Sequence, residues 1–180
     1  MKKQDLQLYQ REVELQCRVA LFSEAQIIPA YALMLKSRPI DAAQFWMLMQ
    51  SFLSAYANIS KLLWGKKRDP HRAGELRASL AVTSEFHYQG DGREVRDDFE
   101  HIDELLDEHR SEPGDHNLVF RSTGDPAMIS GIALDDYLAF YNPGTHEVTF
   151  LGKAFNLSDL RREVEALLPK VQTALAKPPW

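Results

Sequence analysis

The most constraining feature of the sequence is a strongly apolar segment over residues 42–64. It follows a break at residues 37–39 and stops at Gly65, a residue type that commonly ends helices. Its large apolar side chains are Phe45, Trp46, Leu48, Met49, Phe52, Leu53, Tyr56, Ile59, Leu62 and Leu63. A helix that is apolar on most of its circumference lies at the centre of a bundle or in an oligomer interface. The segment therefore predicts a helical core.

Further helices are predicted on both sides of this segment. Residues 5–35 carry apolar positions mostly at the helical period, and Pro29 is expected to kink or end that helix. Another helix is predicted to start at Pro70 and to run to about residue 82, because proline favours the first helical position. A fourth helix, over about 93–110, has a single apolar stripe on an otherwise charged surface. The members of that stripe are Val95, Phe99, Ile102 and Leu106.

The last third of the chain changes character. Residues 137–141 and 147–151 predict two strands of a β-hairpin around a turn that contains Pro143 and Gly144. Ser158 is expected to cap a final helix that runs to about residue 176 and is disturbed at Pro169. The predicted fold is a mainly α, up-and-down helical bundle with a small β-hairpin and a C-terminal helix.

The domain prediction is one domain over residues 1–180. Within it, a bundle over about 1–112 carries an appendage over about 113–180, made of the hairpin and the last helix. A chain of 180 residues buries enough surface to fold without a metal or disulfide.

Composition excludes several classes of protein. The single cysteine, Cys17, rules out an intramolecular disulfide and every multi-cysteine zinc site. The formal charge of −5, from 21 basic and 26 acidic residues, argues against a general binder of polyanions. The sequence contains no run of about 18 apolar residues, so no membrane span is predicted. No apolar segment of signal-peptide type follows the basic N-terminus, so a cytoplasmic location is predicted.

The candidate catalytic residues lie together in the predicted helix over 93–110. Asp97 precedes His101 by four positions and can orient its imidazole ring. Arg96 lies five positions before His101, so the two side chains are about 140° apart around a regular helix. The long arginine stem or a helix distortion must then bring them together. The structural alternative is that Arg96 pairs with Glu100, while His101 pairs with Asp97 or Glu104.

This segment resembles the signature of the HEPN family. In that family an arginine is followed by Asn, Asp or His and, after a short spacer, by a histidine; Arg96, Asp97 and His101 fit that pattern. The stretch VRDDFEHIDELLDEH over 95–109 is similar to an RN-x-FEH-x-DERLD stretch of bacterial HEPN-like proteins. FLSAYANISKLLWG and YNPGTHEVTFLGKAFNLSDL also resemble parts of such proteins, so the likeness extends over about 40–170.

The resemblance implies a dimeric helical bundle and a possible activity. Many HEPN proteins are metal-independent endoribonucleases, among them toxins of toxin–antitoxin pairs and defence effectors. Arg96 and His101 match the pair that converges in the dimer cleft of the family, and Asp97 takes the polar position after the arginine. The expected partners are a second copy, RNA and an antitoxin-like protein, without a cofactor. The alternative is a non-catalytic HEPN-like module that binds a nucleotide or a protein, which the charge of −5 favours.

The remaining candidates concern phosphate and metal. The basic run of the sequence comprises Lys61, Lys66, Lys67, Arg68, His71, Arg72 and Arg77. From it, Lys61, Lys67, Arg68 and Arg72 are predicted to contact RNA phosphates, with a solvated helix edge as the alternative. Asp98 and His101 have the spacing of a di-metal ligand pair, but no second copy of that spacing occurs. No metal site is therefore predicted.

Overall fold

The computed structural model describes residues 2–36, 40–65, 70–83, 104, 106–107, 119–125, 131–132, 136–150 and 153–177. The protein is mainly helical and has one small mixed sheet of four strands in these ranges. The chain divides into two compact units. One unit comprises residues 1–87 and 160–180, and the other comprises residues 88–159. The last helix therefore lies mostly in the unit of the N-terminal helices. The prediction from the sequence had placed this helix in one appendage with the hairpin.

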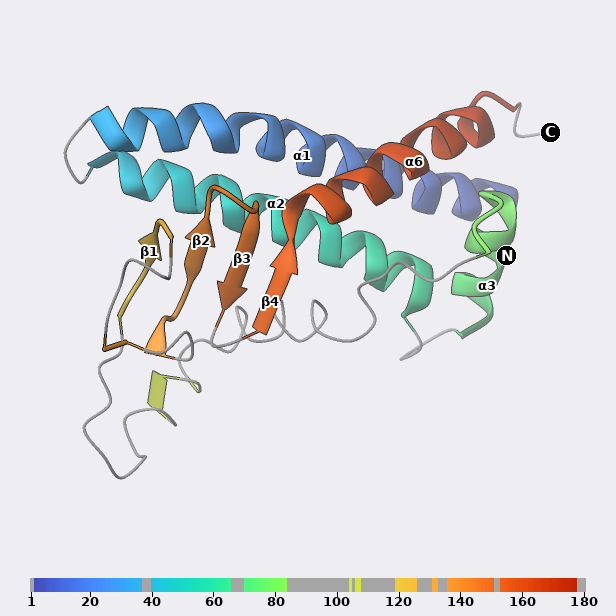
Figure 1. Ribbon diagram of the computed structural model, residues 1–180. Coiled ribbons are helices and arrows are strands. Elements are labelled where there is room, and N and C mark those ends of the chain that lie inside the picture. The colour runs from blue at the N-terminus through green and yellow to red at the C-terminus, as the bar shows by residue number, and fades with distance from the viewer. Residues whose placement is uncertain are drawn as a thin grey trace. The chain divides into compact units, whose positions relative to one another are not determined.

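Helix α1 spans Lys3–Lys36 and is 34 residues long (Figure 1). Its buried positions include Val13, Cys17 and Ile27, which recur at the helical period. The expectation that the helix ends at Pro29 is wrong, because α1 continues through this residue. Proline removes the hydrogen bond to the carbonyl of Ala25, and both residues are exposed, so water can solvate that carbonyl.

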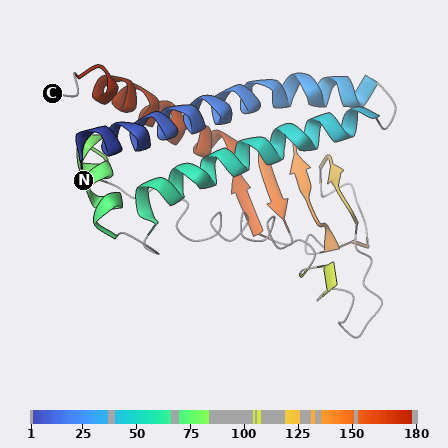
Figure 2. The same cartoon turned by 180° about the vertical axis from the view of Figure 1, so that it is seen from behind.

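Helix α2 spans Ile40–Trp64 and lies antiparallel beside α1, as two opposite views show (Figures 1 and 2). The prediction of a buried apolar helix is confirmed. The most deeply buried large side chains of α2 are Phe45, Met49, Phe52, Tyr56, Ile59 and Leu63. Phe45 also packs its ring 5.9 Å from that of Tyr31 on α1. Gly65 follows the helix and donates its N–H to the carbonyl of Lys61 at 2.9 Å, as its predicted role at the helix end requires.

Helix α3 spans Pro70–Ser79 and begins at the predicted proline. It ends about three residues earlier than expected. The N–H of Val82 turns back to the carbonyl of Arg77 at 3.0 Å, and Ala81 adopts a φ of 50°, a left-handed conformation that stops a helix. Leu76 and Leu80 are buried in the same unit.

Helix α6 spans Leu157–Leu175 and runs through the exposed Pro169. The predicted cap is off by two positions. Asn156 Oδ1 accepts the N–H of Ser158 at 2.9 Å, so Asn156 caps the helix and Ser158 lies inside it. The buried face of α6 repeats at the helical period and consists of Leu157, Leu160, Val164, Leu167, Val171 and Ala174.

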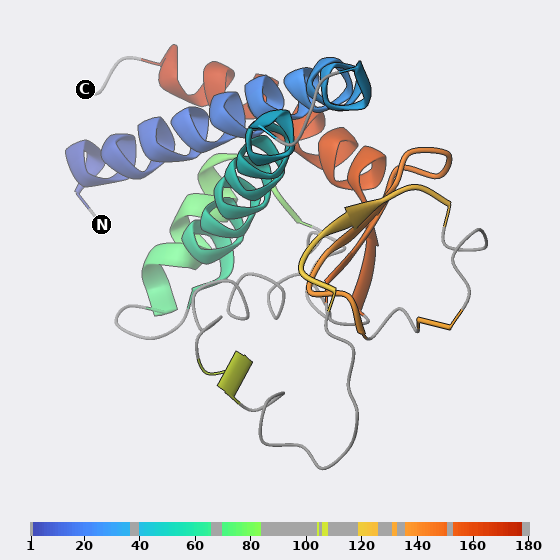
Figure 3. The same ribbon diagram turned by 90° about the vertical axis from the view of Figure 1, so that its left-hand side faces the viewer.

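The second unit contains the sheet (Figure 3). Its strands are β1 Ser122–Thr123, β2 Phe140–Asn142, β3 Glu147–Phe150 and β4 Lys153–Asn156, in the order β1-β2-β3-β4. The antiparallel pair β2–β3, with Tyr141 opposite Val148, confirms the predicted hairpin. Asn142 Oδ1 accepts the N–H of Gly144 at 2.9 Å and thereby closes the turn. Strand β1, parallel to β2, and strand β4 were not predicted.

One helix in the described ranges has the length and hydropathy of a membrane span. An 18-residue window of α1 has a mean hydropathy of 1.2, and 22% of that window is buried. The core helix of a soluble protein and a signal sequence meet the same criteria. Length and hydropathy therefore do not decide whether α1 is a core helix, a signal sequence or a membrane span. The cytoplasmic location stays a prediction.

Candidate functional site

The predicted catalytic residues fall outside the ranges that the structure describes. This applies to Arg96, Asp97 and His101, and also to the predicted phosphate contacts Lys67 and Arg68. Further along the same predicted helix, residues 104 and 106–107 are helical. Leu106, a member of the apolar stripe predicted for that helix, is 39% exposed.

Lys61 and Arg72, the other two predicted phosphate contacts, lie where α2 ends and α3 begins. The guanidinium of Arg72 donates from Nη1 to the carbonyl of Leu62 at 2.7 Å. Its Nη2 lies 3.4 Å from the carbonyl oxygen of Lys61 and 3.5 Å from that of Gly65. The same group lies 5.0 Å over the ring of Tyr9 on α1. Because the last carbonyls of a helix have no intrahelical donors, Arg72 caps α2.

Arg77 repeats this arrangement one and a half turns further along α3. Its Nη1 donates to the carbonyl of Leu63, and its guanidinium lies 5.8 Å from the centre of the Trp64 ring. Two arginines of the basic run thus neutralise the negative end of α2.

The role of Lys61, Lys67, Arg68 and Arg72 in binding phosphate stays a prediction. The sequence did contain the signal for the cap, since Gly65 marks the helix end and both arginines follow within about a dozen residues.

Replacing Arg72 by alanine should lower the free energy of unfolding by about 1–2 kcal/mol, because it leaves the carbonyl of Leu62 without this donor. Urea titration followed by circular dichroism measures the change. Arg11, an exposed arginine on α1, is the matched control, and its alanine variant should stay within about 0.5 kcal/mol of the wild type. Equal stability of the two variants would contradict the capping role.

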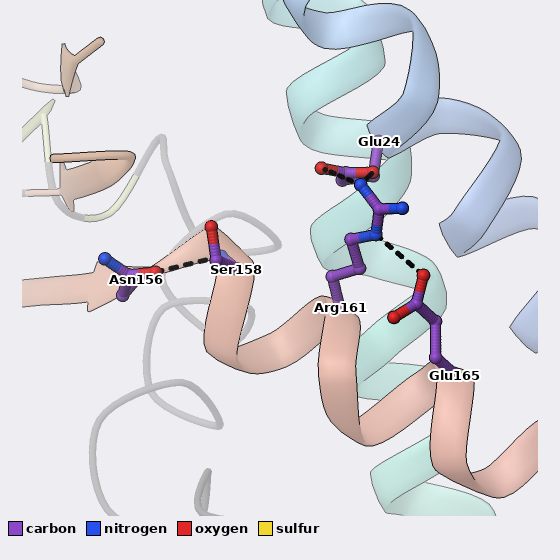
Figure 4. Close-up of polar contacts among 5 residues, drawn as sticks. All are labelled: Glu24, Asn156, Ser158, Arg161 and Glu165. Carbon is purple, nitrogen blue, oxygen red and sulfur yellow. Dashed lines mark hydrogen bonds and ion pairs between the residues drawn. The ribbon is translucent and has the colours of Figure 1, made fainter. Parts of the chain in front are cut away.

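A polar cluster that the sequence analysis did not identify joins α1 to α6 (Figure 4). Arg161 Nη1 lies 3.1 Å from Oε2 and 3.3 Å from Oε1 of Glu24, a residue that is only 9% exposed. Its Nε donates to Glu165 Oε1 at 2.8 Å. The hydrogen bond to Glu165 and the charge of Glu24 raise the pKa of Arg161. The guanidinium therefore compensates a nearly buried carboxylate.

A second polar contact joins α2 to α6. The hydroxyl of Tyr56, a residue that is 1% exposed, donates to Glu163 Oε2. A buried phenol needs such a partner, since losing water without a replacement hydrogen bond is costly. Glu24 and Glu163 thus each form a polar contact that fixes α6 against another helix. Among the residues described here, no group of three or more metal-ligating side chains occurs.

Two adjoining hollows, of about 290 and 320 Å³, lie where α1 begins and where α3 and α6 end. Both are lined by Ser79, Ala174 and Lys177. Gln10 donates from Nε2 to Ser79 Oγ at 3.0 Å, and Lys170 donates to the carbonyl of Ala81 at 3.2 Å. Lys170 thereby places its ammonium just beyond the carboxyl end of α3, where the helix dipole favours a positive charge.

Cys17 is buried in the helical unit. Burial, and secondly the charge of Glu14, raise the pKa of the thiol from 9.0 to about 12. Between these two pH values the unfolded chain releases the thiol proton while the folded chain keeps it. The contribution of Cys17 to stability therefore decreases as the pH rises through this range.

We expect the thiol to react at least about 10³-fold more slowly with a disulfide reagent in the native protein than in guanidinium chloride at pH 8, since three pKa units separate the two states. The release of the coloured leaving thiol gives both rates. A native rate within tenfold of the unfolded rate would contradict the buried position of Cys17.

Comparisons with known proteins reveal no relative: no protein-family model, no curated protein and no solved structure matches the chain.

Proposed function

We propose that the protein is a metal-independent endoribonuclease of the HEPN type, with Arg96 and His101 acting at a cleft between two copies of the chain. The observation that carries this proposal is the segment 95–109, in which Arg96, Asp97 and His101 have the spacing of the HEPN signature. The predominantly helical fold is compatible with the helical bundle of that family and supports the proposal at this coarser level.

The chemistry needs no metal. The imidazole of His101 removes the proton of an RNA 2′-hydroxyl, because histidine is the side chain that exchanges protons most readily near neutral pH. The 2′-oxygen then forms a bond to phosphorus, and the bond from phosphorus to the 5′-oxygen breaks. The second His101 of the dimer protonates the departing oxygen. Arg96 stabilises the negative charge that develops on the phosphoryl oxygens, and Asp97 orients the imidazole.

The biological role that accompanies this activity is that of a cytoplasmic toxin or defence effector. An unregulated ribonuclease harms its own cell, so such a protein needs control. An antitoxin-like protein that covers the cleft would provide it. No cofactor is required for any step.

A second candidate is a non-catalytic HEPN-like module that binds a nucleotide or a protein. Three observations favour it: the formal charge of −5, the acidic side chains around the motif, and the protein contacts that Arg72 and Arg77 make at the end of α2. Those acidic side chains are Asp97, Asp98, Glu100, Asp103 and Glu104. They oppose the approach of a phosphate backbone.

One assay separates the two candidates. Purified protein is incubated with a labelled single-stranded RNA with and without EDTA, alongside the same sequence made of 2′-deoxynucleotides. The ribonuclease cuts the RNA and leaves the deoxy strand intact, because the 2′-hydroxyl is the nucleophile. Filter binding at low and high salt is measured on the deoxy strand. Salt-dependent binding without any RNA cleavage would favour the binding module, and cleavage that EDTA abolishes would contradict the proposed chemistry.

A further inference from the structure

Helix α1 carries an apolar stripe on its solvent side. We call the set Leu8, Leu15, Val19, Phe22 and Leu33 the α1 stripe. Three of its members follow one another at intervals of seven residues, a spacing that shifts each side chain by only about 20° around the helix from the one before. Leu8, Leu15 and Phe22 are 66%, 52% and 69% exposed. Over residues 8–33 the stripe is about 38 Å long.

The size of the stripe points to a macromolecular partner. Its five side chains expose on the order of 500 Å² of apolar surface, at the upper end of what monomeric proteins leave in contact with water. A stable protein interface buries about 800 Å² on each partner. The stripe would form the apolar centre of such a surface, with the exposed side chains beside it on α1 as the rim.

The charges along the stripe distinguish between a parallel and an antiparallel second copy of α1. In the first half of α1, Arg11, Glu12 and Arg18 border the stripe. In the second half, the positions fourteen residues later are Ala25, Gln26 and Ala32. A parallel copy of α1 would bring each charge against its own equivalent. An antiparallel copy brings the charged half of one helix against the uncharged half of the other.

We propose that two copies of the chain associate through the α1 stripe, with the two α1 helices antiparallel and the twofold axis between Val19 and Phe22. In this register Leu8 lies opposite Leu33 of the second copy, and Val19 lies opposite Phe22. Leu15 meets Gln26, and Glu12 meets Pro29. The contact is self-complementary, as a twofold interface requires. It stands without the proposed ribonuclease activity.

The first test compares two charge substitutions. Light scattering at micromolar concentration should give the wild type twice the mass of the double variant described next, whose mass is that of the assembly without the α1 contact; the chain mass is 20.6 kDa. The double variant L15E/F22E should associate at least about 100-fold more weakly, since it places charges at the centre of the contact. Glutamate is a good helix former, so circular dichroism should be unchanged. The control is M47E, which places the same charge on α2 at a side chain that is 60% exposed, and it should keep the wild-type mass.

Cysteine cross-linking tests the register. The variant L8C/L33C should form a covalent dimer on mild oxidation, whereas L8C and L33C alone should not, because each residue faces the other rather than itself. Cross-linking of L8C alone would overturn the antiparallel arrangement. A wild type that is monomeric but binds lipid vesicles through Leu15 and Phe22 would replace the second copy by a membrane surface. An L15E/F22E protein with the same mass as the wild type would overturn the α1 interface and leave the proposed ribonuclease cleft unaffected.

Discussion

The variant H101A is expected to cleave RNA about 10²–10⁴-fold more slowly than the wild type, because the reaction loses its general base. Removing Arg96 should cost on the order of 10²–10³-fold, since the developing charge on phosphorus loses its fixed cation. Single-turnover cleavage of an end-labelled RNA, in EDTA and at fixed pH, gives both ratios. The variant H109A alters a histidine eight residues further along the same predicted helix and should retain the wild-type rate.

The competing structural roles of the pair predict a different result. If Arg96 only pairs with Glu100 and His101 only pairs with Asp97, both alanine variants change stability by at most about 1 kcal/mol and leave any cleavage unchanged. Circular dichroism and urea titration of the same preparations detect a stability change. Cleavage that survives the loss of His101 would exclude it as the base.

The variant M49A should lower the free energy of unfolding by about 2–5 kcal/mol, the range for truncating a buried methionine. Met49 is 1% exposed on the face of α2 that forms the core. The protein supplies its own matched control, since Met47 lies two positions earlier on the same helix and is 60% exposed. Its alanine variant should change stability by less than about 0.5 kcal/mol.

Urea titrations of the two methionine variants, followed at one wavelength, measure this contrast directly. Both substitutions make the same change in helix propensity, so the difference reports burial alone. Similar losses at both positions would show that α2 is not oriented as described.

Elements with a local signal were predictable from the sequence. The apolar circumference of α2, Gly65 at its end and Pro70 at the start of α3 each depend on neighbouring residues, and the structure confirms them. The hairpin was predictable for the same reason, because its Pro-Gly turn joins two apolar segments. The end of a helix at Pro29 was a wrong prediction, since the cost of proline to a helix depends on whether the freed carbonyl reaches water.

Features that depend on distant residues were not predictable. Glu24 and Arg161 are 137 positions apart, and only the packing of α6 on α1 brings them together. Strand β1 has only two residues, too short for an alternating pattern to stand out. The cap that Arg72 forms on α2 could have been predicted from the sequence. The positive charge of Arg72 instead led to the prediction of a phosphate contact. The proposed pair Arg96 and His101 rests on the sequence motif.

The ends of the RNA products test the proposed mechanism most directly. Wild-type protein is incubated with a single-stranded RNA in EDTA, and the fragments are examined by mass spectrometry. Attack by the 2′-oxygen predicts 2′,3′-cyclic phosphates on one fragment and 5′-hydroxyls on the other, with both products absent from H101A. Fragments that carry 3′-hydroxyls and 5′-phosphates would show that water is the nucleophile, and would contradict the role assigned to His101.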